Sequence, residues 1–189
     1  MILPEDMLIH VIKYLDLKDL LSLRLTSRYF KELSSHGRPV LSTSNLPTFP
    51  RTNNPINISV CLSHILEFLR IFPRTKVLKI SFLSVNDNLI NQILSPYLEE
   101  LDFSFNTKLT DKGLDLISKK CKKLRVLKIT CCNSVTIEGL KKKLAKFKKL
   151  KKLHLWSSYS ISKEDSDELS KMFENVSIIY YPMFGYIEN

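Results

Sequence analysis

The sequence predicts an α/β protein in which a short helical module precedes a solenoid that has a parallel sheet on its concave side and helices on its convex side. Two observations predict this fold. Apolar residues recur at helical spacing through residues 3–33. Further along, four similar apolar segments follow one another at intervals of 23, 26 and 26 residues, centred on Leu78, Leu101, Leu127 and Leu153. A repeat of this length is typical of stacked solenoids.

The composition permits a folded core and gives no sign of export. The chain has 189 residues, 44% of them apolar, which suffices for one ordinary domain or two small ones. No stretch approaches the roughly 18 apolar residues of a membrane span. The N-terminus carries Glu5 and Asp6 in place of a basic leader. We therefore expect no membrane contact and a cytoplasmic and/or nuclear location.

The reactive residue types form no catalytic or metal-binding pattern. Cys61, Cys121, Cys131 and Cys132 contain no CxxC pair, so we expect reduced thiols, no zinc site and no disulfide framework. The four histidines lie far apart, and four glycines are too few for a glycine-rich phosphate loop. We expect a protein that is not an enzyme and that binds no metal or cofactor.

Three short helices are predicted in residues 4–33. Pro4 fits the first turn of a helix, Asp16 can cap a second helix, and Thr26 or Ser27 can cap a third. The apolar side chains of the first helix cover much more of its circumference than the roughly 100° that one core requires. A unit this short rarely folds stably alone. The module is therefore expected to bury its spare apolar surface against a partner.

The segment LPEDMLIHVIKYLDLKDLLSLRLTSRYFKEL resembles the F-box motif along nearly its whole length. It opens with Leu3-Pro4 and has Arg24 and an aromatic Phe30, while Ser27 stands where F-boxes often have Cys. The resemblance implies docking on a Skp-family adaptor, which links to a cullin and its RING subunit. By the same resemblance, the adaptor would contact Leu3, Pro4, Leu8, Ile12, Leu15, Leu17 and Leu20. Some of these residues must instead form the module's own core, and the alternative is a three-helix cap on the repeats.

Three segments follow from this pattern: an F-box at 1–38, a linker at 39–57 and a repeat domain at 58–189. The linker has four prolines among Ser, Thr and Asn residues, which break helices. It is either a spacer between ligase and substrate or a loop packed on the first repeat. Apolar residues such as Val40 and Leu41 favour the packed loop.

The repeats match the pattern L-x-x-L-x-L-x-x-N/C, as in Leu124, Leu127, Ile129 and Cys132. Segments that are predicted to be helical, such as LTDKGLDLISKKCKK, lie between these strand segments. They resemble leucine-rich repeats of the cysteine-containing subtype, which commonly follow F-boxes. Cys121 and Cys132 are then expected in the core. A further step of 26 residues from Leu153 predicts Ile179 at the centre of a last strand.

Strand alternation places the residues between the core leucines on the concave sheet face, where solenoids bind their partners. Exposed aromatic residues beside charged ones are typical of binding hot spots. We predict that a protein substrate contacts Phe82, Asp102, Phe105, Lys128, Lys152, His154, Trp156 and Tyr180. The alternative is that the C-terminal tail, YYPMFGYIEN, folds back over Trp156 and caps the solenoid.

The net charge of +10 is concentrated in residues 141–152, where eight of twelve residues are lysine. Three interpretations compete: a solvated helix face, attraction to an acidic or phosphorylated substrate, and nucleic-acid binding or a nuclear signal. Nucleic-acid readers interleave aromatic residues with basic ones, and this run contains only Phe147. Nucleic acid is therefore not the expected partner.

The function that the sequence predicts is that of a non-catalytic substrate receptor in an SCF-type cullin-RING ubiquitin ligase. The F-box would dock on the adaptor, and the repeats would hold a protein substrate for ubiquitination and degradation. The alternatives are a leucine-rich-repeat interaction scaffold without a ligase role and a basic nucleic-acid-binding module. The sequence does not identify the substrate or any modification that it requires.

Overall fold

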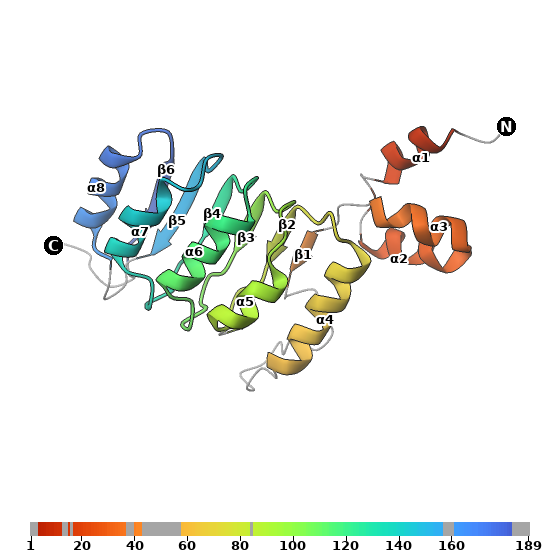
Figure 1. Ribbon diagram of the computed structural model, residues 1–189, viewed down its shortest axis with the longest axis horizontal. Coiled ribbons are helices and arrows are strands. Elements are labelled where there is room, and N and C mark those ends of the chain that lie inside the picture. The colour runs from red at the N-terminus through yellow and green to blue at the C-terminus, as the bar shows by residue number, and fades with distance from the viewer. Residues whose placement is uncertain are drawn as a thin grey trace.

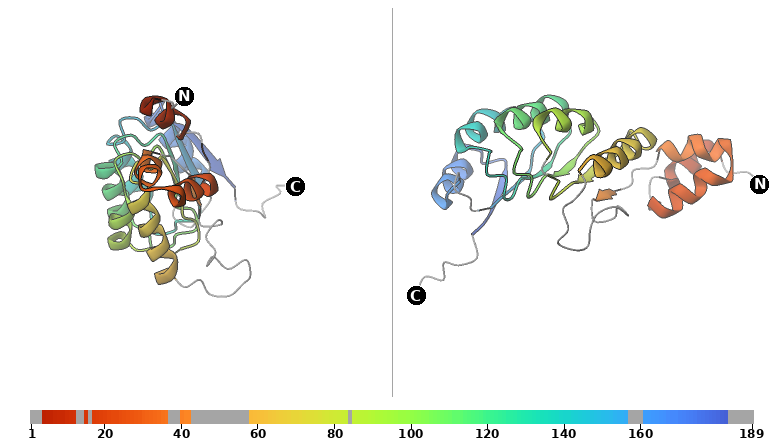
Figure 2. Two further views of the ribbon diagram at one scale, coloured as in Figure 1. Left: turned by 90° about the vertical axis from the view of Figure 1, so that its right-hand side faces the viewer. Right: turned by 90° about the horizontal axis from the view of Figure 1, so that it is seen from below.

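A computed structural model describes residues 4–12, 15, 17–36, 40–42, 58–83, 85–156 and 161–182. A helical module lies at one end of a solenoid, whose strands line one side and whose helices line the other (Figure 1 and Figure 2). The predicted fold class, three helices followed by a solenoid with a parallel sheet, is confirmed. Within these residues, no helix has both the length and the apolar character needed to cross a lipid bilayer.

The N-terminal module consists of three short helices and one 3-10 turn, which pack mainly on each other: α1 (Glu5–Ile12), α2 (Leu17–Thr26), α3 (Arg28–Leu33) and η1 (Ser34–His36). Ser27 caps α3, because its hydroxyl accepts a hydrogen bond from the backbone N–H of Phe30. Ile12, Leu20 and Leu33 are buried and form the module's core. The three predicted helices are therefore present, and the third begins after Ser27.

The solenoid has one parallel sheet in which each strand pairs with the next along the chain. Its strands are β1 (Val40–Ser42), β2 (Val77–Lys79), β3 (Glu100–Asp102), β4 (Val126–Lys128), β5 (Lys152–Trp156) and β6 (Ser177–Tyr181). The connecting helices are α4 (Ile58–Ile71), α5 (Asp87–Ile93), α6 (Asp111–Lys120), α7 (Ile137–Leu144) and α8 (Lys163–Met172). Strand β1 lies inside the predicted linker and pairs with β2, with Leu41 buried.

The predicted central leucines form the core row of the sheet. Leu78, Leu101, Leu127 and Leu153 are fully buried and face one another in register. The expectation for the last strand was wrong by one residue, because Ile178, not Ile179, pairs with Leu153. The last repeat is 25 residues long by this register, one shorter than the two before it.

Polar contacts join the repeats of α5, α6 and α7 at the starts of these helices. Asp87 accepts hydrogen bonds from the N–H and hydroxyl of Thr110 (3.2 and 2.6 Å), and Asp111 accepts the same pair from Thr136 (2.9 and 2.7 Å). In the same strand-to-helix loop as Thr110, buried Asn106 donates to the carbonyl of Ile80 (2.8 Å). These contacts replace hydrogen bonds to water that burial removes, so they fix the stacking distance between repeats.

Candidate protein-binding surfaces

The helical module leaves large apolar side chains uncovered. Met7 and Val11 on α1 are 57% and 52% exposed, and Leu25 at the end of α2 is 89% exposed. The same helix α1 buries Ile12 in the module core. Helix α1 therefore has one face in the core and a second apolar face that no described residue covers, a combination that marks interaction surfaces.

The predicted adaptor-binding residues fall into two groups. Pro4 is exposed, and Leu8 and Leu15 are half-buried, whereas Ile12 and Leu20 are 3% and 0% exposed. In the free chain the latter two belong to the module's core. Leu3 and the side chain of Leu17 lie outside the described residues. Met7 and Val11 were absent from the predicted set, although their helical spacing from the set's Leu8 and Leu15 could have indicated them.

A row of aromatic rings lines the concave side of the sheet. The rings of Phe82 and Phe105 stack with centroids 4.2 Å apart, and Phe105 lies 6.4 Å from Trp156, measured between ring centroids. Phe82 is 52% exposed. The row includes three of the predicted substrate-binding residues, and the structure brings them together from three different repeats.

Two of these rings project from residues with left-handed backbone conformation. The φ angles of Phe82, Phe105 and Cys131 are 65°, 61° and 55°, and the three residues occupy equivalent positions in consecutive repeats. Side chains other than glycine rarely adopt this conformation, and each such residue costs about 1–3 kcal/mol. The backbone N–H groups of Phe82 and Phe105 donate to Ser104 and Thr130 of the next repeat, which holds the conformation.

The last strand adds a tyrosine to this row, but not the one predicted. Tyr181 pairs with Trp156, its ring lies 6.1 Å from that of Trp156, and its hydroxyl is hydrogen-bonded to Nδ1 of His154 (3.0 Å). Tyr180 pairs with Leu155 and packs against the core. Its predicted outward orientation was wrong, because the short last repeat shifts the alternation by one residue. The tail from residue 183 lies outside the described residues, so the proposed cap is not described beyond Pro182.

Charged residues flank the aromatic row. Lys128 pairs with Glu100 (3.2 Å), and Asp102 accepts a hydrogen bond from the N–H of Ser104 (3.0 Å), while Lys152 is exposed. Burial and the nearby Lys128 ammonium lower the pKa of His154, which favours the neutral imidazole. The predicted substrate-binding residues other than Tyr180 thus lie on one face, and this face has both apolar and polar groups.

Comparisons with known proteins match the N-terminal module and two of the repeats. Residues 1–38 match the F-box-like family, and residues 94–118 and 120–142 match the Leucine Rich repeat family. The chain has an F-box-like domain followed by leucine-rich repeats. No curated protein sequence matches it. Among the solved structures that do match is the complex of Rad7 and Elc1 from yeast, with 17% identity and a TM-score of 0.47. The match covers 88% of the present chain and 34% of the matched chain in that complex. The present chain therefore spans about a third of the length of the matched chain.

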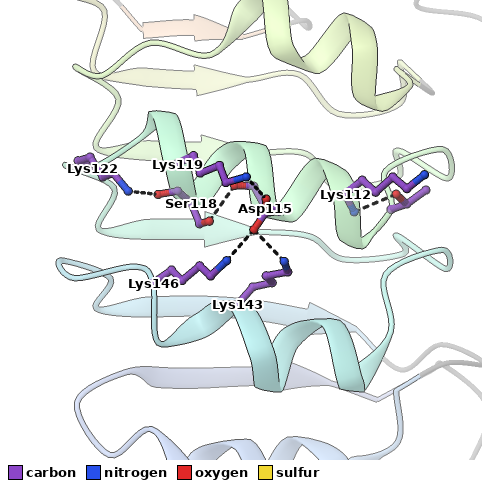
Figure 3. A network of polar contacts seen from close by, with 8 residues as sticks. Lys112, Asp115, Ser118, Lys119, Lys122, Lys143 and Lys146 are labelled. Carbon is purple, nitrogen blue, oxygen red and sulfur yellow. Dashed lines mark hydrogen bonds and ion pairs between the residues drawn. The ribbon is translucent and has the colours of Figure 1, made fainter.

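The lysine run of the leucine-rich repeats divides into paired and unpaired residues. The carboxylate oxygens of Asp115 on α6 form ion pairs with the ammonium nitrogens of Lys119, Lys143 and Lys146, at 2.7, 2.8 and 2.8 Å (Figure 3). These ammonium groups hold the pKa of the Asp115 carboxyl well below its usual range. Lys141 pairs with Glu168 of the next repeat (2.8 Å). The lysines on the helical side of the run therefore join three repeats.

Two cysteines of the repeats, Cys121 and Cys132, are core residues, as predicted. Cys121 and Cys132 are 2% and 3% exposed, and burial raises the pKa of each thiol to about 12. Such thiols stay protonated and are poor nucleophiles. Cys131 is only half-buried and lies beside the aromatic row. Among the residues that the structure describes, no three His, Cys, Asp or Glu side chains are grouped closely enough to hold a metal ion.

Proposed function

We propose that this protein is the substrate-recognition subunit of an SCF-type cullin-RING ubiquitin ligase. The F-box-like domain docks on a Skp-family adaptor, which links it to the cullin and RING subunits, and the repeats bind a protein substrate for ubiquitination. The protein itself carries out no chemistry, and it acts by raising the concentration of substrate near the ligase's active subunit. We expect a cytoplasmic and/or nuclear location.

The observation that carries this proposal is the uncovered apolar face of α1. A domain of this size cannot leave Met7 and Val11 exposed without cost unless a partner covers them. The module helices pack mainly on each other and not on the solenoid, which leaves that face accessible. On these grounds we propose an adaptor face of Pro4, Leu8 and Leu15 extended by Met7 and Val11. Ile12 and Leu20 support it from the module's core.

The proposed substrate face is the aromatic row with its charged neighbours. Phe82, Phe105 and Trp156 offer stacked, partly exposed rings of the kind that form the centre of protein interfaces. The left-handed positions of Phe82 and Phe105 hold two of these rings in place before binding, so little conformational entropy is lost when a substrate docks.

Adaptor docking is tested by a matched pair of substitutions. Met7→Asp places a charge on the proposed face, and Met172→Asp places the same charge on α8 of the repeats, where the methionine is similarly exposed (57% and 51%). Purified full-length variants would be mixed with a Skp-family adaptor and analysed by size-exclusion chromatography. We expect complex formation to be lost only for Met7→Asp. Equal binding by both variants would remove α1 from the docking face.

The receptor role is tested by affinity purification from cells in which the proteasome is inhibited. Phe105→Asp should lose the proteins that accumulate with the wild-type protein and should keep the adaptor. Met7→Asp should lose the adaptor and keep those proteins. If neither variant separates adaptor from accumulating proteins, the two surfaces do not have the separate roles proposed.

A further inference from the structure

A second surface, distinct from the aromatic row, lies at the edge of the sheet where the strands begin. There the backbone forms a continuous ladder: the N–H of Glu99 donates to Lys76, Arg125 to Glu99, Lys151 to Arg125 and Ser177 to Lys151, at 2.7–2.8 Å. Equivalent positions in adjacent repeats are therefore held side by side, about 4.8 Å apart. Each repeat contributes one rung to this ladder, which is the residue just before its strand. The side chain of that residue sets the charge of the rung.

Five cations gather on two rungs of this ladder. Lys123 and Arg125 come from the turn before β4, and Lys148, Lys149 and Lys151 come from the turn before β5. Together with Glu99 they line a pocket of about 500 Å³, which we call the basic pocket. Its only carboxylate, Glu99, already forms an ion pair with Lys76 outside the pocket. The pocket thus carries a large uncompensated positive charge.

These cations differ from the other lysines of the same run. Lys141, Lys143 and Lys146 are neutralised by Glu168 and Asp115. Within the described part of the chain, no carboxylate pairs with Arg125, Lys148, Lys149 or Lys151. Like charges held this close repel one another, which disfavours the empty pocket and favours a bound anion.

We propose that the basic pocket binds an acidic segment of another protein, in which carboxylates or phosphorylated side chains follow one another closely. Two rungs span a distance that a few extended residues cover, at about 3.3 Å each. Toward β6, Glu174 lines the neighbouring pocket together with Lys148 and Lys151. A long polyanion that ran in this direction would meet its carboxylate.

The same features count against a nucleic acid. Sequence-tolerant nucleic-acid sites combine basic residues with aromatic rings on which bases stack. Among the described residues, none that lines the basic pocket is aromatic, and nearby Tyr97 already has the ammonium of Lys123 5.2 Å from the centre of its ring. A short acidic peptide needs only the charges, and these are present.

The test measures fluorescence anisotropy of labelled probes with the full-length protein at about 0.15 M salt. The probes are a peptide of alternating Glu and Ser, the same peptide phosphorylated on its serines, a Gln–Ser peptide of equal length, and single-stranded oligothymidylate. The pocket variant carries Arg125→Gln, Lys149→Gln and Lys151→Gln. The control variant carries Lys108→Gln, Lys112→Gln and Lys142→Gln, which remove the same charge from exposed lysines elsewhere on the repeats.

Binding of either acidic peptide, absent for the Gln–Ser peptide, supports the proposal if the pocket variant weakens it about tenfold or more and the control variant changes it much less. Tighter binding of the phosphorylated peptide would in addition identify phosphate as the preferred group. Equal weakening by both variants would show a general effect of net charge and would overturn the proposal. Tighter binding of oligothymidylate than of both acidic peptides would also overturn it. Urea unfolding followed by the fluorescence of Trp156, measured in parallel, confirms that the repeats of the pocket variant are folded.

Discussion

At the scale of single residues, two glycines decide how closely neighbouring repeats approach. A Cβ at Gly139 would overlap with the carboxylate of Asp111, and a Cβ at Gly113 would overlap with that of Asp87. The same carboxylates accept the hydrogen bonds of Thr136 and Thr110 that join one repeat to the next. The Gly-Leu sequence at the start of these helices thus has a steric cause. A side chain at the glycine would occupy the space of the aspartate carboxylate from the preceding repeat.

Gly139→Ala is therefore expected to destabilise the protein by about 1–3 kcal/mol, although alanine alone would favour the helix by about 1 kcal/mol. The added methyl group displaces Asp111 and breaks its two hydrogen bonds to Thr136. Urea unfolding followed by the fluorescence of Trp156 measures the change. In Asp111→Ala the carboxylate is gone, so Gly139→Ala should cost nothing further in that background. Additive losses would show that the overlap with Asp111 is not the cause.

Asp115 makes part of the stability depend on pH. Its carboxyl pKa is lowered from 3.8 by Lys119, Lys143 and Lys146, so the stabilisation is present above about pH 4 and is lost as the pH falls toward the folded-state pKa. Asp115→Asn should cost about 1 kcal/mol at pH 7, and this cost should begin to fall at about pH 3 and fall further at lower pH, measured by urea unfolding. Asp167→Asn, which breaks one exposed pair with Lys163, should show a smaller effect. A cost for Asp115→Asn that is unchanged at about pH 3 and at lower pH would exclude the ion pairs as its origin.

At the scale of elements, the sequence pattern predicted the strands that follow the regular leucine spacing, and it missed the strands where the length of the repeat changes. The leucine spacing placed β2 to β5 correctly, because each core leucine must face the same side of the sheet. It misplaced β6, where one residue fewer in the repeat reverses which tyrosine faces outward. Strand β1 was missed because Leu41 lies 37 residues before its partner Leu78, outside the spacing of 23 to 26 residues that identified the other strands.

The register of β6 can be tested with the two adjacent tyrosines. Tyr181→Ser should increase quenching of Trp156 by acrylamide, because the Tyr181 ring lies against Trp156, and should change the melting temperature little. Tyr180→Ser should lower the melting temperature, because Tyr180 packs against the core, and should leave quenching unchanged. The reverse pattern would restore the register with Ile179 at the centre of the strand.

At the scale of the whole molecule, the order of the two domains was predictable from the sequence. Which residues of each surface are buried, paired or exposed was not. The division at residues 38 and 57 stays a prediction, and β1 shows that the start of the predicted linker takes part in the sheet. Helical spacing could not separate Leu8 from Ile12, because both lie on the apolar side of α1 and only the packing of α2 and α3 decides which is buried. In the same way, the lysine run gave no sign that Asp115 would bind some of its members and leave others unpaired.

The weak attachment of the F-box-like domain to the solenoid has a consequence for its dynamics. Its helices share most of their contacts with each other, and Arg24, whose guanidinium lies 5.9 Å from the centre of the Phe72 ring, bridges to the repeats. So small a unit opens at a low free-energy cost. We expect its amides to exchange with solvent faster than those of β2 to β5 in the free protein.

Adaptor binding should then slow amide exchange in the F-box-like domain and leave amide exchange in the repeats unchanged. A ligand at about 100 times its Kd slows exchange through opening by about 100-fold wherever opening releases the ligand. Hydrogen exchange measured by mass spectrometry should show this protection in α1 to α3 and none in β2 to β5. Met172→Asp should behave as the wild type, and Met7→Asp should show no protection, since it carries a charge on the face that the adaptor would cover. Protection that spreads equally over the strands would mean that module and solenoid open together, and adaptor binding would then stabilise the fold as one unit.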